Sequence, residues 1–205
     1  MNTREQNYKF FCKTVNEEFN NLILHLDLDN LNKAADLIRL SENRGNRLHI
    51  SGIGKPSYVA GYAASLFSSI GTPAYFLHGT EAVHGSCGQL VPGDIVLFIS
   101  NSGETNEMRS TITAVKNNGC KIISITGNSD SWLAKKSDIH LFSGISQEGG
   151  PLNRAPRMSI IAEIFVIQSL SIFLQSDNNL TPQQYVKWHP GGKLGHLREE
   201  EMRKC

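Results

Sequence analysis

The chain has 205 residues, with 20 lysines and arginines against 19 aspartates and glutamates, so its formal net charge at pH 7 is +1. This balance, without a basic stripe, argues against a nucleic-acid surface and against a charged disordered tail. Hydrophobic residues make up 40% of the chain, which is long enough to bury the core of one α/β domain.

The first part of the chain predicts two helices. Residues 4–24 place phenylalanine, valine, leucine and isoleucine at helical spacing. A second helix is expected to begin with Asp29 as its N-cap and to carry an apolar face. We expect these helices to form an N-terminal extension, residues 1–44, before a domain that covers residues 45–205.

The pattern then changes to short apolar strands that alternate with helices. Strands are expected at 47–51, 74–77, 94–100, 121–126 and 138–142. Helices are expected at 56–70, 104–117, 131–136 and 156–175, with a short one from Thr181. The nearly continuous apolar run of the third strand is typical of a strand covered on both faces. The alternation predicts an α/β three-layer sandwich with a five-stranded parallel sheet and right-handed crossovers.

Two further patterns concern the cellular compartment. The most apolar stretch, residues 160–174, is interrupted by a glutamate, a glutamine and two serines, so we expect a buried helix rather than a membrane span. Residues 1–6 lack the basic start and apolar run of a secretion signal. The sequence therefore predicts a cytoplasmic protein that binds no membrane.

The cysteines agree with a reducing compartment. They lie far apart and include no Cys-x-x-Cys pair, which argues against a disulfide framework or a zinc knuckle. The four are Cys12, Cys87, Cys120 and Cys205. We expect Cys87 and Cys120 to be buried structural thiols.

Ligands of such sheets collect beyond the carboxyl ends of the strands, which points to the loops at 51–56, 100–105 and 143–156. In the first loop, a dinucleotide-binding turn would require glycine at position 57, where Ser57 stands. The second loop offers three hydroxyls, a glycine and the amides of a helix N-terminus, which suit a phosphate monoester. The same residues suit an ordinary helix cap with Glu104 in the first turn, and the segment alone supports both interpretations equally.

Three histidines lie in loops rich in glycine or proline, namely His78, His84 and His189. They are the better catalytic candidates, because imidazole titrates near neutral pH. The histidines in helix or strand patterns, His25, His49 and His140, are expected to pack or to face solvent. We do not expect a metal site at these histidines.

Five segments recur in this order in one known family. They are Ser51-Gly52-Ile53-Gly54-Lys55, Gly71-Thr72-Pro73, the run from His78 to Gly85, the run from Ser100 to Thr105, and the run from His189 to Gly195. On these segments the chain resembles the sugar-phosphate isomerase (SIS) domain, and specifically the D-arabinose 5-phosphate isomerase type. The resemblance covers residues 45–197 and implies a flavodoxin-like SIS domain. Many relatives continue into paired CBS modules, whereas this sequence ends at Cys205, so a single-domain form without regulation by those modules is expected.

The resemblance implies conversion of D-arabinose 5-phosphate to D-ribulose 5-phosphate through an enediol, without a metal ion or an organic cofactor. This chemistry requires a base at carbon, an acid/base partner at the oxygens and a donor for the oxyanion. By motif position the catalytic residues are Lys55, Glu104, Glu148, His189 and His84. Glu148 is expected to be the carbon base, and His189 to open the ring or to move protons between oxygens. Lys55 would stabilise the enediolate, while Glu104 would orient groups or share protons.

The resemblance also implies a homo-oligomer, a tetramer, in which a neighbouring subunit can supply the histidine. The phosphate of the substrate is expected to bind at Gly54, Ser57, Ser100, Ser102, Thr105 and Arg157. Pro56 stands where many SIS proteins have serine, so a hydroxyl and an N–H are lost and Ser57 is the candidate substitute. Arg157-Met158-Ser159-Ile160 replaces a serine- and threonine-rich run. Arg157, together with Arg154, is then a candidate for a charge-assisted phosphate contact, and the alternative is a site that accepts another sugar phosphate or only senses it.

Other interpretations stay open on the sequence alone. A phosphosugar-binding regulatory module without turnover needs only the loop at 100–105. An SIS isomerase or lyase that acts on another sugar phosphate fits the fold, although a lyase fits the His-Pro-Gly-Gly segment poorly. Lys55 and Glu148 also suit an ordinary solvated pair of loop charges. The isomerase hypothesis requires Glu148 and His189 to converge on one pocket.

Overall fold

The centre of the fold is a parallel sheet of five strands in the order β2-β1-β3-β4-β5. The computed structural model describes residues 2–202, so the expectation for Cys205 lies outside the described residues. The strands are β1 (Leu48–Gly52), β2 (Ala74–Phe76), β3 (Ile95–Ile99), β4 (Lys121–Thr126) and β5 (Ile139–Phe142). All four neighbouring pairs run parallel. This confirms the predicted sheet.

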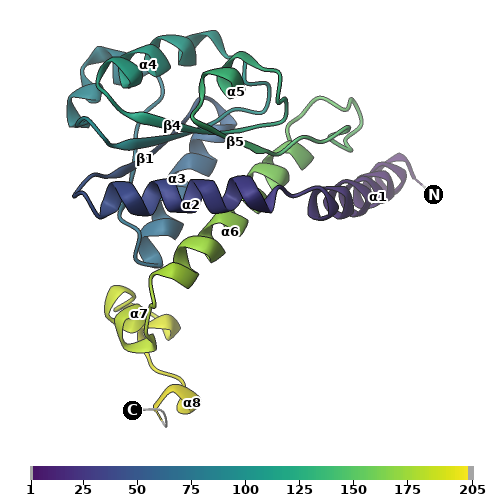
Figure 1. Ribbon diagram of the computed structural model, residues 1–205. Helices are drawn as coiled ribbons and strands as arrows, with labels where there is room; N and C mark the ends of the chain where they lie inside the picture. The colour runs from purple at the N-terminus through teal and green to yellow at the C-terminus, as the bar shows by residue number, and fades with distance from the viewer. Residues whose placement is uncertain (1, 203–205) are drawn as a thin grey trace.

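Helices cover both faces of the sheet (Figure 1). One face carries α2 (Leu28–Glu42), α3 (Lys55–Ser69) and α6 (Met158–Asp177). The other carries α4 (Asn106–Asn117) and α5 (Trp132–Lys136), with the 3-10 turns η1 (Glu81–His84) and η2 (Ser86–Gln89) after β2. The central strand β3 is buried throughout, and its side chains alternate between the two cores. The predicted three-layer sandwich is therefore confirmed.

The helix starts differ from the sequence predictions by one to a few residues. The side chain of Asp27 accepts a hydrogen bond from the Asn30 amide at 2.9 Å, which makes Asp27 the N-cap of α2. The expected cap, Asp29, is wrong; it lies in the first turn and pairs with Lys33. Helix α4 begins at Asn106, so Glu104 lies in the preceding loop rather than in the first turn.

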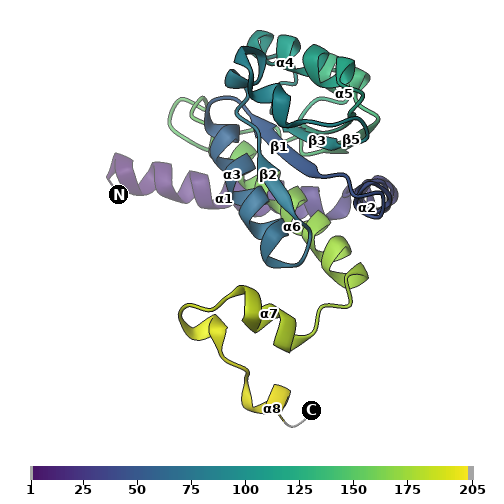
Figure 2. The same ribbon diagram turned by 90° about the vertical axis from the view of Figure 1, so that its left-hand side faces the viewer.

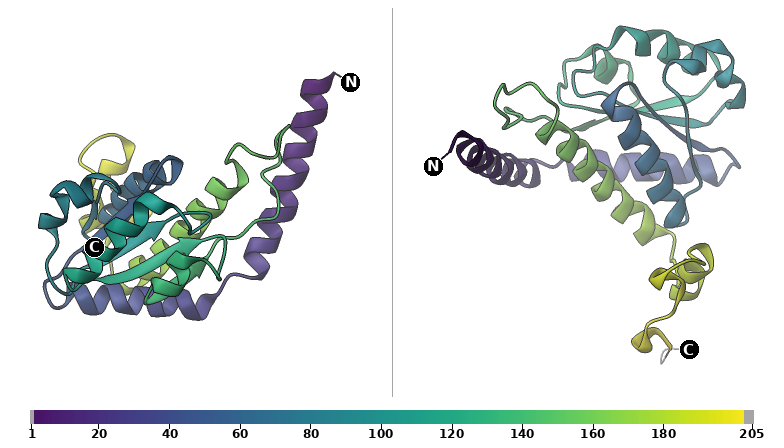
Figure 3. Two further views of the ribbon diagram at one scale, coloured as in Figure 1. Left: turned by 90° about the horizontal axis from the view of Figure 1, so that it is seen from above. Right: turned by 180° about the vertical axis from the view of Figure 1, so that it is seen from behind.

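Helix α1 (Thr3–Leu24) extends beyond the sheet (Figure 3), and its buried residues, Thr14, Glu18 and Leu22, lie in its second half. There the ring of Phe19 meets the ring of Phe165 on α6 edge-on, with centroids 4.8 Å apart. Helix α2 differs from α1, because its Leu31, Ala34 and Ile38 belong to the main core together with the strands.

Helix α6 is the one described helix that is long and apolar enough to cross a membrane by length and composition alone. In the fold, half of its most apolar window is buried. Val166, Ile167 and Leu170 are fully buried against the sheet side. The interaction with the core confirms the prediction that residues 160–174 form a buried helix.

The C-terminal arm contains α7 (Pro182–Trp188), the turn η3 (Lys193–Gly195) and α8 (Glu199–Met202). It lies beyond the C-terminal end of α6, away from the sheet (Figure 2). Trp188 packs against Gly71, where a methyl group would lie 3.0 Å from the indole ring. Since Gly71 lies in the turn that leads into β2, the arm is anchored at the amino end of the sheet.

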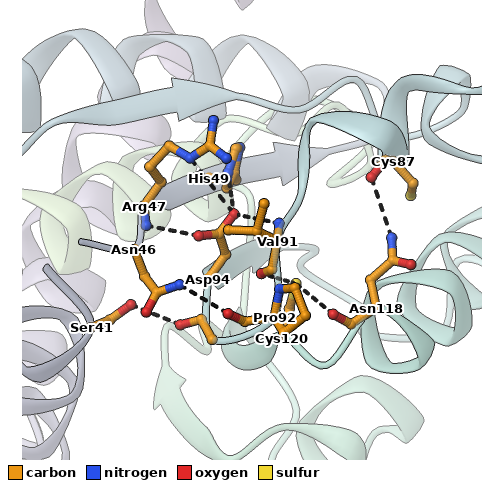
Figure 4. Close-up of polar contacts among 11 residues, drawn as sticks. Ser41, Asn46, Arg47, His49, Cys87, Val91, Pro92, Asp94, Asn118 and Cys120 are labelled. Atoms are coloured by element: carbon orange, nitrogen blue, oxygen red, sulfur yellow. Dashed lines mark hydrogen bonds and ion pairs between the residues drawn. The ribbon is translucent and has the colours of Figure 1, made fainter. Parts of the chain in front are cut away.

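Asp94 joins the amino ends of β1 and β3 (Figure 4). Its fully buried carboxylate accepts hydrogen bonds from the Arg47 amide at 2.9 Å, the Val91 amide at 3.0 Å and His49 Nε2 at 3.1 Å. Burial opposes its ionisation, but these hydrogen bonds outweigh burial and lower the pKa of Asp94. Cys120 lies nearby, and burial raises the pKa of its thiol to about 11. Cys120 is therefore a structural thiol, whereas Cys87 is only partly buried.

Replacement of Asp94 by alanine tests this junction. Asp94→Ala should lower the free energy of unfolding by about 3 kcal/mol, because two partly buried amides and a buried imidazole lose their acceptor. Urea unfolding near neutral pH measures the loss. Because the folded-state pKa of Asp94 is depressed, this stability is present above the unfolded pKa of 3.8 and disappears as the pH falls through the folded value.

The matched control is Asp130→Ala, since the side chain of Asp130 is 91% exposed in its pair with Lys135. We expect this control to change stability by less than about 0.5 kcal/mol. Equal effects of the two variants, or an Asp94→Ala deficit that persists undiminished in acid, would contradict the assignment.

Candidate functional site

Three loops touch one another at the carboxyl ends of β3, β4 and β5. The Gly127 amide donates to the Asn101 carbonyl oxygen at 2.8 Å, which joins the loops after β3 and β4. A methyl group on Gly144 would lie 2.8 Å from the Gly127 carbonyl oxygen, so the loop after β5 follows closely. The loop after β1 meets the loop after β2, because a methyl group on Gly79 would lie 2.7 Å from the Gly52 carbonyl oxygen. This close packing makes the carboxyl edge a continuous surface.

The loop after β3 (residues 100–105) forms a compact turn around its own hydroxyls. Ser100 Oγ accepts from the Gly103 amide and lies 3.2 Å from Thr105 Oγ1, while Ser102 Oγ accepts from the Glu104 amide at 3.2 Å. Gly103 has a φ of 65° and lies against the side chain of Ser131, so only glycine fits. Within the described residues, no side-chain hydrogen bond caps the 12-residue helix α4, which leaves its first amides for an anion.

Glu104 uses both carboxylate oxygens within the protein. Oε1 accepts from the Trp132 amide at 2.7 Å, and Oε2 pairs with Arg109 Nη2 at 2.7 Å. The Arg109 guanidinium in turn lies 5.1 Å from the centre of the Trp132 ring. Glu104 therefore holds the loop against the start of α5, and its side chain is 47% exposed.

Glu148 lies at the N-terminus of α6, in the long loop that follows β5. Its Oε2 accepts from the Arg157 amide at 2.6 Å and the Ser159 amide at 3.1 Å, and its Oε1 accepts from Ser159 Oγ at 2.6 Å. The Glu148 amide is fixed as well, because it donates to Asn153 Oδ1 at 2.7 Å. Three hydrogen bonds to the carboxylate and one from the backbone amide thus fix the position of Glu148.

The same loop is held from its other side by Glu18 of α1, a residue that the sequence analysis missed. The Glu18 carboxylate is 6% exposed and accepts from the amides of Ser146 and Gln147 at 3.1 Å and from the Ser146 hydroxyl. Gly149 packs on Thr14 of the same helix. The available signal was an acid inside an apolar helical stripe, between Val15 and Leu22. Helix α1 therefore helps to position Glu148.

The remaining candidates for phosphate binding surround these loops. Arg157 is exposed; its guanidinium lies over Gly150 and makes no ion pair within residues 2–202. Ser57 is less available as a donor than expected, because its hydroxyl donates to the Gly54 carbonyl oxygen at 2.6 Å. Lys55 is the exposed first residue of α3, and Gly54 before it has a φ of 69°.

The two candidate histidines lie outside this cluster of loops. His84 is exposed at the end of η1, after β2. His189 lies at the end of α7, where its ring stacks on Tyr185 with centroids 4.0 Å apart and its Nδ1 lies 2.8 Å from the Tyr185 carbonyl oxygen. Glu148 and His189 are at opposite ends of the 20-residue helix α6, which spans about 30 Å. Within one chain they do not converge on one pocket.

The site consists of hydroxyls, amides, carboxylates and two cations. Among the described residues, no group of three or more histidine, cysteine, aspartate or glutamate side chains is placed to hold a metal ion. The family model of the SIS domain matches residues 42–172.

The chain belongs to the SIS-domain family. Among curated SIS-domain relatives, the arabinose 5-phosphate isomerase KdsD of Yersinia pestis is 39% identical over 146 residues, which are 71% of this chain and 44% of the relative. The arabinose 5-phosphate isomerase KpsF of Escherichia coli is 35% identical over 174 residues, which are 82% of this chain and 55% of the relative. The chain spans about half the length of the curated relatives that it matches.

A solved structure matches over its whole length. It comes from E. coli CFT073, was determined in complex with arabinose 5-phosphate, and is 31% identical to this chain. The match has a TM-score of 0.81 and covers 93% of this chain and 100% of that one. The SIS-domain fold is thus confirmed independently of the family model.

Glu18→Ala should release the loop that precedes Glu148. We expect the amides of Ser146 and Gln147 to lose their protection from hydrogen exchange, and the free energy of unfolding to fall by about 2 kcal/mol, because the buried acceptor is gone. Glu17→Ala is the matched control, since Glu17 is exposed and only pairs with Lys13 at 3.6 Å. Unchanged exchange at Ser146 in Glu18→Ala would show that Glu18 does not hold this loop.

Proposed function

We propose that this SIS-domain chain is an aldose–ketose isomerase that interconverts D-arabinose 5-phosphate and D-ribulose 5-phosphate. The observation that carries the proposal is the fixed carboxylate of Glu148 on the same carboxyl edge as the hydroxyl loop at 100–105. A base and an anion cradle are the two parts that this reaction needs on one surface. Relatives named arabinose 5-phosphate isomerase and the related complex with arabinose 5-phosphate support the choice of substrate.

In this proposal, the phosphate binds at the hydroxyl loop and the first amides of α4. Arg157 adds a charged donor, since its guanidinium is unpaired within residues 2–202 and it adjoins Glu148 through its own backbone amide. Two classes of donor, neutral dipoles and one guanidinium, then share the phosphate charge. This explains how a chain with a net charge of +1 binds a dianion.

The proton transfer itself is assigned to Glu148. Its carboxylate accepts the proton from the carbon next to the carbonyl and returns it to the neighbouring carbon, while the electron pair passes through the enediolate. Lys55, exposed at the start of α3, stabilises the enediolate oxygen. Glu104 holds the hydroxyl loop in place through Trp132 and Arg109.

A second subunit supplies the histidine. Because His189 lies past the far end of α6, it reaches a carboxyl edge only on another copy of the chain. We therefore propose a homotetramer in which the C-terminal arm brings His189 to a neighbouring site, with His84 as a further contribution from the loop after β2. We further propose that the protein is cytoplasmic, binds neither membrane nor nucleic acid, and divides into the extension 1–44 and the domain 45–205.

Glu148→Gln tests the assignment of the base. We expect kcat to fall by at least about 100-fold while binding of the sugar phosphate is retained, because the amide keeps the shape and cannot accept the proton. Turnover is followed from ribulose 5-phosphate in deuterium oxide, where the isomerase exchanges the proton on the carbon next to the carbonyl and forms an aldose phosphate. Asp130→Asn, at an exposed site, is the control.

Undiminished turnover in Glu148→Gln would remove Glu148 from the chemistry. Binding without exchange in the unmodified protein, over a panel of pentose and hexose phosphates, would instead favour a regulatory module that senses a phosphosugar.

Mixing two inactive variants tests the supply of His189 by a neighbour. Chains carrying Glu148→Gln and chains carrying His189→Ala should each be inactive, and co-refolding them should restore part of the activity. The recovered sites combine the intact Glu148 of one chain with the intact His189 of the other. Size-exclusion chromatography confirms that mixed oligomers form; if they form without recovery, His189 does not act across an interface.

A further inference from the structure

Helix α6 contains a buried acid that none of the roles above uses. Glu163 is 0% exposed, and neither of its carboxylate oxygens has a hydrogen-bond partner among the residues that the structure describes. A charged carboxylate without partners is costly in the interior of a protein. The fold therefore tolerates Glu163 at this position only as a neutral carboxylic acid.

Glu163 lies directly behind Glu148. It follows Ser159 by one helical turn on the same face of α6, and the Ser159 amide and hydroxyl both donate to Glu148. Glu148 is also the charge that acts on Glu163 from outside its own helix. The two carboxyl groups thus form a pair near the start of α6, with Glu148 toward the site and Glu163 in the interior.

The start of α3 lies at the same end of the fold as the start of α6. Helices α3 and α6 run in parallel, side by side (Figure 3), with Gln168 bonded to Tyr62 and Asn178 bonded to the Ile70 carbonyl oxygen. These contacts join residues 106 and 108 positions apart. Because the two helices run in the same direction, Lys55 at the start of α3 and Met158 at the start of α6 lie at the same end of the helix pair. Glu163 therefore lies in the interior behind its proposed base, at the end of the helix pair that also contains the proposed cation.

The surroundings of Glu163 favour its neutral form. Burial raises the pKa of Glu163 to about 8, and the charge of Glu148 adds to the effect. The side chains that α2 and α3 bury toward α6 are not ionisable, and neither are the nearby β4 and β5 side chains of the same core. Among the ionisable residues of the other elements, Glu18 of α1 accepts hydrogen bonds from residues 146 and 147. Lys55, Arg154 and Arg157 are exposed.

We propose that Glu163 is a positioning residue for the isomerisation proposed above, on which this inference rests. As a neutral acid, it leaves Glu148 as the single negative charge at the start of α6. When Glu163 ionises, a second negative charge lies behind the base, repels the phosphosugar and disfavours the enediolate. Glu163 thereby sets the alkaline limit of the reaction.

The pH profile of Glu163→Gln tests the proposal, because glutamine copies the neutral acid and does not titrate. In the wild type, kcat/KM should fall about fivefold between pH 8 and pH 9. In Glu163→Gln it should change less than twofold over this range and match the wild type near pH 7. Glu42→Gln is the matched control, since Glu42 also has a buried oxygen without a partner in the described part of the chain but lies at the end of α2, and it should keep the wild-type profile.

Thermal melting gives a readout that needs no substrate. The folded-state pKa of Glu163 is raised, so the wild type loses stability as the pH rises from about 4.5, the ordinary value, to about 8. The melting temperature of Glu163→Gln relative to the wild type should therefore increase over this range and level off above it. Glu163→Met, which fills the space with an apolar side chain, gives the same comparison if the glutamine variant folds poorly.

The outcomes separate the two proposals. If the wild type turns over and the glutamine and methionine variants keep its alkaline decline, the inference about Glu163 is wrong and the proposed function stands. A melting difference that does not vary with pH also overturns it. If the wild type converts no pentose phosphate, the proposed function fails, and the role of Glu163 in it fails as well.

Discussion

The first amides of helix α6 need an acceptor that the helix itself does not supply, and Glu148 provides it from the loop before the helix. This one interaction ties the long loop between β5 and α6 to the start of α6. It fixes the carboxylate against a positive helix end and leaves Arg157 directed outward beside it. The other parts of the carboxyl edge are arranged around this closure, because the loops after β3, β4 and β5 touch in turn.

Three glutamates near the start of α6 have different roles because their surroundings differ. Glu18 is fully engaged in holding a loop, Glu148 holds a helix end and still faces the site, and Glu163 has no hydrogen-bond partner within residues 2–202. The burial of Glu163 makes it a neutral acid, and the charge of Glu148 acts in the same direction. The isomerase proposal uses this difference, since Glu18 and Glu163 are buried and only Glu148 of the three is partly exposed.

The sequence predicts the frame of the protein better than its polar contacts. Continuous apolar runs such as residues 94–100 identify buried strands, because both faces of the sheet are covered. The cap of α2 was placed at Asp29 instead of Asp27, since two aspartates two residues apart carry the same local signal. Glu18 escaped notice because its partner, Ser146, lies 128 residues further along the chain. The direction of the arm was equally hidden, because the motif around His189 says nothing of where Trp188 packs.

The two ends of the sheet have different roles. Asp94 and its donors fix the register of the strands at the amino end of the sheet. Among the described residues, the only proposed site residue near that end is His189 of the C-terminal arm. The loops at the carboxyl end contain almost all the proposed site residues and do not take part in that register. A substitution at Arg157, directly before α6, can therefore change the surface offered to a ligand while the strand alignment stays the same.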